Sequence, residues 1–246
     1  MSGARKSRLD STSCAAYISL ILAKNVLCMT TVSYREINRS LPVGKILCLG
    51  RNYAEHAREM GSAPSETPVV FLKPPTALLK SGEKVEIPGC SREMHHEVEL
   101  VVLIGRPGKL IPKEKAFEHV GGYGVGLDMT LRDVQAEAKK KGLPWSVAKG
   151  FDTSAPVSEF VEREKIADPH DLTLTLEVNG TVRQRSNTRN MIFGVDEIIS
   201  YLSTVFSLET GDLVFTGTPE GVGPVHSGDV LEATLDNIAR CRVEIA

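Results

Sequence analysis

Two glutamates in the segment His95-His96-Glu97-Val98-Glu99 have the residue type and the spacing that a metal site requires. They open the apolar run 100–104, which is typical of a buried strand. Side chains two apart on a strand share a face, so the two carboxylates would lie about 6.5–7 Å apart along the backbone. Buried carboxylates this close repel each other and lose hydration unless a cation lies between them. The segment predicts either a divalent-cation site or an edge strand with two solvated glutamates.

Asp128 is a candidate for a third oxygen ligand. It ends the glycine-rich segment 121–128 and precedes a predicted helix that ends at residue 141. If that helix starts near Asp128, then Arg132 and Gln135 lie on the same face, at i+4 and i+7. Such a stripe suits an anion beside a metal, whereas the alternative is an ordinary Asp–Arg pair on a surface helix. Three carboxylates would leave roughly three octahedral positions for water or substrate, as Mg²⁺ or Mn²⁺ prefers.

His56 and Glu59 could supply a base. They stand three residues apart on a predicted helix that follows Arg51-Asn52-Tyr53. At this spacing the carboxylate can hydrogen-bond the imidazole, orient it and raise its basicity. Such a pair can deprotonate water, and the alternative interpretation is a solvated helical face.

Lys149 and the loop 216–223 offer groups for a substrate carboxylate. Lys149 is a lone lysine after an apolar stretch, where it could neutralise a carboxylate or snorkel to the surface. The loop offers backbone N–H groups and the Thr218 hydroxyl, although a plain connection between strands would have a similar sequence.

The composition excludes several classes of function. The 29 basic residues stand against 31 acidic ones, a net charge of −2, so there is no basic excess to bind nucleic-acid phosphates. The five cysteines are scattered without a CxxC pair, which argues against zinc knuckles and favours reduced thiols in an intracellular protein. Neither a GxGxxG fingerprint nor a GxxxxGK[ST] phosphate loop occurs.

The N-terminal part of the sequence predicts a different organisation from the rest. We expect residues 1–40 to form a poorly ordered extension and residues 41–246 to form one catalytic domain. The apolar stretch 14–28 is too short for a membrane span and is interrupted by Lys24. It suits either a weak signal or transit peptide, or an extension ahead of an effective start at Met29. The expected location is the cytoplasm, with mitochondria as the alternative, and neither membrane nor nucleic acid is an expected partner.

From residue 45 onward the chain predicts short strands broken by glycine and proline, with a few helices. Helices are expected at 52–60, 113–119, 131–141 and 195–206. Strands are expected at 45–49, 69–73, 84–87, 97–104, 121–128, 172–178, 182–185, 213–216, 230–234 and 241–245. Asn179-Gly180 predicts a type I′ hairpin turn. Without βαβ regularity, this pattern indicates an α+β, β-rich domain of antiparallel and mixed sheets with peripheral helices.

The ordered motifs of the chain resemble those of the fumarylacetoacetate hydrolase family, from about residue 41 to the C-terminus. The motifs are Gly50-Arg51-Asn52-Tyr53-Ala54-Glu55-His56, Phe71-Leu72-Lys73-Pro74, His95-His96-Glu97-Val98-Glu99, Gly121-Gly122-Tyr123, Leu127-Asp128-Met129-Thr130, Arg132-Asp133, Lys139-Lys140-Lys141-Gly142-Leu143-Pro144-Trp145 and Thr216-Gly217-Thr218-Pro219.

This resemblance implies a mixed β-roll, a homodimer and one role for each candidate residue. It implies a Mg²⁺ or Mn²⁺ site at Glu97, Glu99 and Asp128. It places His56 and Glu59 on a mobile lid that activates water, with Lys149 completing the catalytic set. It assigns substrate binding to Arg51, Arg132, Gln135 and Thr218.

The resemblance also implies a small β-diketo or β-keto acid as substrate. The expected reaction is hydrolysis of an acylpyruvate to pyruvate and a carboxylic acid, with oxaloacetate decarboxylation through the same stabilised pyruvate enolate. The alternatives are keto–enol tautomerisation of oxaloacetate, a fumarylpyruvate-type hydrolase of aromatic degradation, and a non-catalytic oxaloacetate-binding protein.

Overall fold

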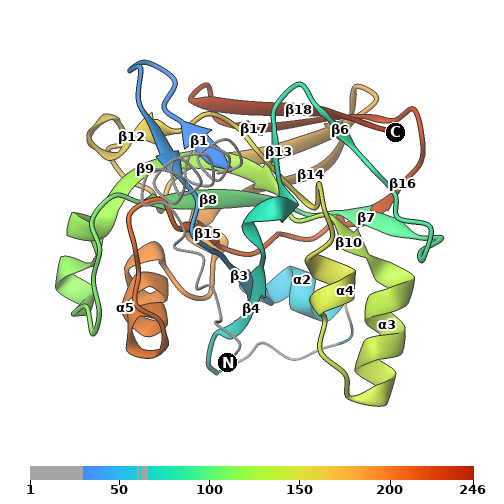
Figure 1. Cartoon of the computed structure of the whole chain (residues 1–246), viewed down its shortest axis with the longest axis horizontal. Coiled ribbons are helices and arrows are strands. Elements are labelled where there is room, and N and C mark those ends of the chain that lie inside the picture. Colours follow the sequence, from blue (N-terminus) through green and yellow to red (C-terminus); the bar gives the residue numbers. More distant parts are fainter. Residues whose placement is uncertain (1–29, 60, 62–65) are drawn as a thin grey trace, which may run out of the picture. The chain divides into compact units, whose positions relative to one another are not determined.

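The computed structural model of the chain describes residues 30–59, 61 and 66–246 (Figure 1). The predicted targeting segment, and the first 29 residues of the predicted extension, lie outside the described residues. The described part begins with a small hairpin, in which β1 (Thr31–Ser33) pairs antiparallel with β2 (Ser40–Pro42).

The largest sheet has eight strands and is mixed. Seven strands follow one another in the order β4 (Val69–Lys73), β3 (Ile46–Gly50), β15 (Leu213–Phe215), β8 (Val98–Ile104), β9 (Val120–Leu127), β11 (Ala155–Val157) and β5 (Leu78–Lys80), and β12 (Val161–Glu162) pairs with β9. The pairs β3–β15 and β11–β5 are parallel, whereas β8–β9 and β3–β4 are antiparallel. This sheet confirms the predicted β-rich α+β class.

Two further sheets complete the fold. The five-stranded sheet has the order β14 (Thr181–Asn187), β13 (Thr173–Val178), β17 (Val230–Leu235), β18 (Ala239–Ile245) and β6 (Lys84–Val85). The three-stranded sheet has the order β10 (Thr130–Leu131), β7 (Met94–His96) and β16 (Gly223–Val225). Between β13 and β14, Asn179 and Gly180 have φ values of 52° and 76°, which confirms the predicted turn because type I′ needs a positive φ at both residues.

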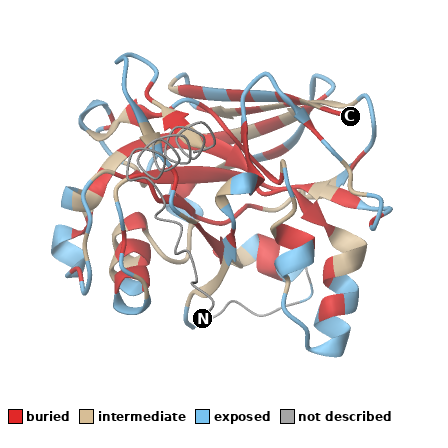
Figure 2. Cartoon of the chain, in the orientation of Figure 1, coloured by how far each residue is buried: buried red, intermediate tan, exposed pale blue. Residues whose placement is uncertain are grey.

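The core surrounds β8, whose seven residues are all buried (Figure 2). Leu100 and Val102 pack in one apolar cluster with residues of the five-stranded sheet, such as Leu176. Val101 and Leu103 pack in a second cluster on the other face. A strand covered on both faces explains the continuous apolar run in the sequence.

The α-helices lie together on the side of the molecule away from β17 and β18 (Figure 1). The α-helices are α2 (Ala54–Glu59), α3 (Arg132–Lys141), α4 (Ser146–Lys149) and α5 (Val195–Val205). The 3₁₀ helices are η1 (Pro75–Ala77), η2 (Lys113–His119), η3 (Arg163–Lys165) and η4 (Thr188–Asn190). Helix α3 is followed by the cap residue Gly142, whose φ of 67° is the left-handed conformation that glycine favours. No helix in the described ranges is long and apolar enough to cross a membrane.

Two local expectations were wrong. The strand predicted to start at Glu97 begins at Val98, so Glu97 lies in the one-residue gap between β7 and β8. The helix expected at 131–141 is α3, which begins at Arg132, but the condition that it start near Asp128 is not met, because β10 intervenes. Asp128 therefore does not share a helical face with Arg132 and Gln135.

Candidate active site

The three candidate metal ligands meet where β8 and β9 pair. The antiparallel register sets Val98 opposite Leu127, and the Asp128 backbone N–H donates to the Glu97 carbonyl oxygen at 2.8 Å. One carboxylate oxygen from each of Glu97, Glu99 and Asp128 lies within 4.8 Å of the others. All three side chains are buried, and the structure brings these three predicted residues together.

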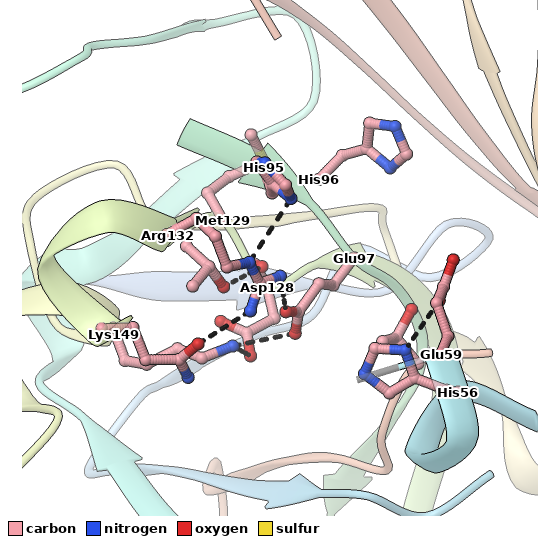
Figure 3. Close-up of polar contacts among 12 residues, drawn as sticks. His56, Glu59, His95, His96, Glu97, Asp128, Met129, Arg132 and Lys149 are labelled. Carbon is pink, nitrogen blue, oxygen red and sulfur yellow. Dashed lines mark hydrogen bonds and ion pairs between the residues drawn. The ribbon is translucent and has the colours of Figure 1, made fainter. Parts of the chain in front are cut away.

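Cationic side chains pair with two of these three carboxylates (Figure 3). The Lys149 ammonium lies 2.8 Å from Glu97 Oε2 and 2.5 Å from Asp128 Oδ2. Arg132 Nη2 lies 2.5 Å from Glu97 Oε1. Burial alone would raise the pKa of Glu97, but the charges of Lys149 and Arg132 outweigh it and hold that pKa well below its ordinary range.

Lys73 is a further buried cation for which the sequence analysis proposed no role. Its ammonium lies 2.8 Å from Asp128 Oδ1 and donates to Ser154 Oγ at 3.0 Å. It also donates to the backbone carbonyl of Lys149, so it ties the carboxylate to the helix that carries Lys149. The available signal was a lysine at the end of the apolar strand 69–73.

Glu99 differs from the other two carboxylates because no cationic side chain in the described part of the chain pairs with it. Its Oε2 accepts one hydrogen bond, from the Gly217 backbone N–H at 2.7 Å. Burial raises the pKa of Glu99 well above its usual range, and Asp128 and Glu97 act in the same direction. A divalent cation between the three carboxylates would offset both the burial of Glu99 and its repulsion by Glu97 and Asp128. An all-carboxylate donor set suits the hard ions Mg²⁺ and Mn²⁺.

Gly217 has to be a glycine for the Glu99 contact to form. Its φ is +98°, and a Cβ there would lie 2.7 Å from the Asn52 Cβ. The Asn52 side chain, which is fully buried, donates to the Thr216 carbonyl at 2.7 Å and accepts from the Phe193 N–H at 2.7 Å. It thereby holds the loop that brings Gly217 to Glu99.

The His56–Glu59 pair forms on α2 as predicted. His56 Nδ1 lies 3.3 Å from Glu59 Oε2, and both Glu59 oxygens also lie 3.2 Å from the Gly221 backbone nitrogen. Because an ionised carboxylate can only accept, Nδ1 carries the proton and Nε2 is the basic nitrogen. Figure 3 shows this pair on one side of Glu97 and Lys149 on the other.

A single cavity joins most of the predicted site residues. It is lined by Leu49, Gly50, Arg51, His56, Phe71, Glu97, Arg132, Gln135, Lys139, Trp145, Lys149 and Thr218. Of the predicted residues, Glu59, Glu99 and Asp128 are absent from this lining. Within the lining, Arg132 Nη1 donates to Gln135 Oε1 at 2.7 Å, so these two predicted residues are neighbours on α3.

The two histidines of the motif lie beside the acidic triad without joining it. His95 Nε2 lies 2.8 Å from Glu93 Oε1, and Arg132 Nε donates to His95 Nδ1 at 3.3 Å. His96 Nδ1 lies 3.0 Å from the side-chain oxygen of Gln184.

Comparison with known proteins shows that sequence similarity covers most of the chain. The family model described as "Fumarylacetoacetate (FAA) hydrolase C-terminal" matches residues 45–246. The chain is 51% identical over 214 residues to "Oxaloacetate tautomerase FAHD1, mitochondrial" of Mus musculus, covering 87% of this chain and 97% of that protein. It is 46% identical over 201 residues to the protein of the same name in Arabidopsis thaliana, covering 82% and 90%.

Among solved structures, the chain is similar to fumarylpyruvate hydrolase from Pseudomonas aeruginosa in complex with Mn²⁺ and pyruvate. The TM-score is 0.85 at 41% sequence identity, over 89% of this chain and 96% of that one. The likeness therefore extends to proteins named for two different reactions.

Proposed function

Because the chain belongs to the fumarylacetoacetate hydrolase family, we propose that it is a divalent-metal-dependent enzyme that acts on small β-keto or β-diketo acids. One observation carries this proposal: a buried carboxylate triad lies beside the cavity that His56 lines. A protein that only binds a keto acid needs no oriented base, so the His56–Glu59 pair favours an enzyme over a binding protein.

Different residues of the chain would bind the metal, neutralise charge and bind the substrate at this site. Glu97, Glu99 and Asp128 would hold Mg²⁺ or Mn²⁺, which when bound supplies a Lewis acid that lowers the energy of an enolate. Lys149 and Lys73 neutralise the remaining carboxylate charge. The cationic and polar groups that line the cavity would bind the substrate carboxylate and carbonyl, namely Arg51, Arg132, Gln135 and Thr218.

The reaction we place first is the interconversion of keto and enol oxaloacetate. The Nε2 atom of His56 would take a proton from C3 of the keto form, and the imidazolium would return it to the enolate oxygen to give the enol. Glu59 would stabilise the imidazolium through Nδ1 while the proton is held. The Mus musculus and Arabidopsis thaliana relatives named oxaloacetate tautomerase support this choice over the hydrolysis that the sequence analysis placed first.

Hydrolysis of acylpyruvates is the second candidate, and the likeness to a fumarylpyruvate hydrolase favours it. In that reaction His56 would take a proton from water, and the resulting hydroxide would attack the distal carbonyl. The carbon–carbon bond then breaks to release a carboxylic acid, and the pyruvate enolate takes up a proton. Decarboxylation of oxaloacetate would form the same enolate with loss of carbon dioxide.

The test follows the ultraviolet absorbance of enol-oxaloacetate and of acetylpyruvate with the purified protein, in Mg²⁺ and in EDTA. Fast, Mg²⁺-dependent loss of the enol without pyruvate release would support the tautomerase. Loss of acetylpyruvate with release of pyruvate would support the hydrolase instead. Activity that is equal in Mg²⁺ and EDTA would contradict the proposal as a whole.

Three broader features belong to this proposal. We expect residues 41–246 to act as the catalytic domain, and a homodimer to be the working assembly. The Mus musculus relative carries "mitochondrial" in its name, which favours mitochondria over the cytoplasm for this chain.

A further inference from the structure

Gln184 is a buried amide that the proposed mechanism has not used. Of the seven residues of β14, all described, it is the only one that is buried, with an exposed fraction of 1%. A polar side chain is buried at a cost unless each of its groups finds a partner. The partners of Gln184 lie in two segments of the site, β7–β8 and the loop 216–223.

The backbone contacts of Gln184 fix which end of its amide is the oxygen. Its Oε1 accepts from the Val98 N–H at 3.1 Å, and its Nε2 donates to the Pro219 carbonyl at 2.9 Å. A backbone N–H can only donate and a carbonyl oxygen can only accept, so the reverse orientation of the amide would lose both bonds. His96 Nδ1, 3.0 Å from Oε1, is a second donor to the same oxygen.

The remaining N–H of the amide determines how Thr218 can act. Gln184 Nε2 donates to Thr218 Oγ1 at 2.9 Å, so the hydroxyl oxygen is already an acceptor. The hydroxyl proton has to find another acceptor, and no side chain or carbonyl in the described part of the chain takes it. Thr218 lines the cavity, where an incoming oxygen would be available.

We propose that Gln184 is a positioning residue that fixes the Thr218 hydroxyl as a hydrogen-bond donor to the carboxylate of the bound keto acid. This inference rests on the proposed function, because it takes a keto acid as the ligand of the cavity. An anion is recognised by donors, and a hydroxyl that is free to rotate could present its lone pairs instead. Gln184 Nε2 occupies one lone pair of the hydroxyl oxygen and cannot accept the hydroxyl proton, so that proton points away from residue 184 and toward the cavity.

Gln184→Glu reverses this polarity with almost no change in shape. The variant keeps an oxygen that can accept from Val98 and His96, but it replaces the NH₂ group with an oxygen that accepts. The Thr218 proton would then turn toward residue 184 and away from the cavity. A hydrogen bond to a charged group contributes enough that its loss should weaken binding by about tenfold to a hundredfold.

The measurement is calorimetric titration of pyruvate into the Mn²⁺-loaded protein. Gln184→Glu and Thr218→Val should each raise the Kd of pyruvate by about tenfold to a hundredfold. In the Thr218→Val background, adding Gln184→Glu should change the Kd by less than about twofold, because both changes remove the same hydrogen bond. Simple repulsion between pyruvate and the new charge would persist in that background, so the double variant separates the two explanations.

Two further variants complete the test. Asn190→Asp makes the same amide-to-carboxylate change at an exposed position of η4 and should leave the Kd within about twofold of the wild type. Thr218→Ser should also bind within about twofold, because the same amide would orient a serine hydroxyl. Thr218→Ser keeps the amide intact, so it tests the inference even if Gln184→Glu fails to fold.

The outcomes distinguish this inference from the proposed function. Wild-type protein that binds Mn²⁺ but no pyruvate would contradict the proposed function itself. A Kd that Thr218→Val raises and Gln184→Glu leaves unchanged would overturn the inference alone. Additive effects of the two changes, or loss of binding in Thr218→Ser, would also overturn it.

Discussion

The acidic triad and the His56–Glu59 pair lie beside one cavity, but different forces hold them in place. The triad is set at the paired ends of β8 and β9, inside the largest sheet, and is buried throughout. The pair is carried by the six-residue helix α2, and the Glu59 side chain is 35% exposed. Glu59 is tied to the rest of the site by the Gly221 backbone N–H.

This difference separates binding of the cation from movement of the proton. The backbone ladder of a buried sheet fixes the carboxylates, so their geometry exists before any ligand arrives. The base, His56, depends instead on its side-chain hydrogen bond to Glu59 on α2. Changes in the triad should therefore lose both metal and reaction, whereas changes in the pair should lose the reaction alone.

Glu99→Gln should have the largest effect, a loss of metal-dependent turnover of about ten-thousandfold, because it removes a ligand of the Lewis acid. The fold should persist, because the change removes a buried charge that no cationic side chain pairs with and leaves an oxygen for the Gly217 N–H. The measurement is turnover of enol-oxaloacetate in Mg²⁺, with thermal unfolding alongside. Glu244→Gln, at a side chain that is 44% exposed, is the matched control. Full activity in Glu99→Gln would refute the triad assignment.

His56→Asn should reduce turnover by about a thousandfold, because general base catalysis is lost while the triad stays intact. Mn²⁺ affinity should stay within about twofold of the wild-type value. His226→Asn, at an 80% exposed histidine, serves as the control. A His56→Asn variant that lost Mn²⁺ affinity together with turnover would show that the two regions are not separable.

Glu59→Gln should have a smaller effect, a loss of about tenfold in turnover. The amide oxygen can still accept from His56 Nδ1, but a neutral acceptor stabilises the imidazolium less than a carboxylate does. Glu55→Gln, at an exposed residue of the same helix, is the comparison. If turnover fell as far as in His56→Asn, orientation of the imidazole, and not its charge, would be the main role of Glu59.

Asp133→Asn should change stability and leave turnover nearly unaltered. Asp133 lies in the first turn of α3, and its carboxylate accepts from Ser91 Oγ at 2.6 Å and from the Arg92 N–H at 2.9 Å. Burial opposes ionisation, but these hydrogen bonds outweigh it and hold the pKa of Asp133 below its unfolded value of 3.8. The stabilisation is therefore complete above pH 3.8 and is lost as the pH falls through the lower folded pKa.

The free energy of unfolding should accordingly fall by about 1 kcal/mol in Asp133→Asn at pH 7. Urea unfolding between pH 7 and pH 3 measures it, and the gap to the wild type should narrow only below pH 3.8. Asp152→Asn, at an exposed aspartate, controls for the loss of one charge. A gap that is constant with pH would show that the carboxylate charge is not what stabilises the start of α3.

The sequence predicted the parts of the site that are formed by residues close together in the chain. The spacing of Glu97 and Glu99 indicated two carboxylates on one face of a strand, with a cation site and a solvated edge as the alternatives, and the spacing of His56 and Glu59 allowed a hydrogen-bonded pair on one helix. The sequence did not predict that Glu97 lies in the gap before β8, because β7, the strand that precedes this gap, has only three residues. Short strands are defined by their partners and leave almost no periodic signal of their own.

The rest of the site depends on contacts between segments that are far apart in the chain. Lys73 meets Asp128 across 55 positions, and Gln184 meets Val98 across 86. Asn52, the first residue of the predicted helix 52–60, donates to the carbonyl of Thr216, 164 positions away. Which segments pair is decided by the packing of whole sheets, so no window of sequence contains that information.

Glu97, Glu99 and Asp128 should hold one divalent cation independently of the base on α2. Calorimetric titration of Mn²⁺ into the wild type, His56→Asn and Glu99→Gln tests it most directly. We predict one equivalent of Mn²⁺ per chain in the wild type and in His56→Asn, and no binding by Glu99→Gln at concentrations that saturate the wild type. Equal binding by Glu99→Gln, or no binding by the wild type, would contradict the claim.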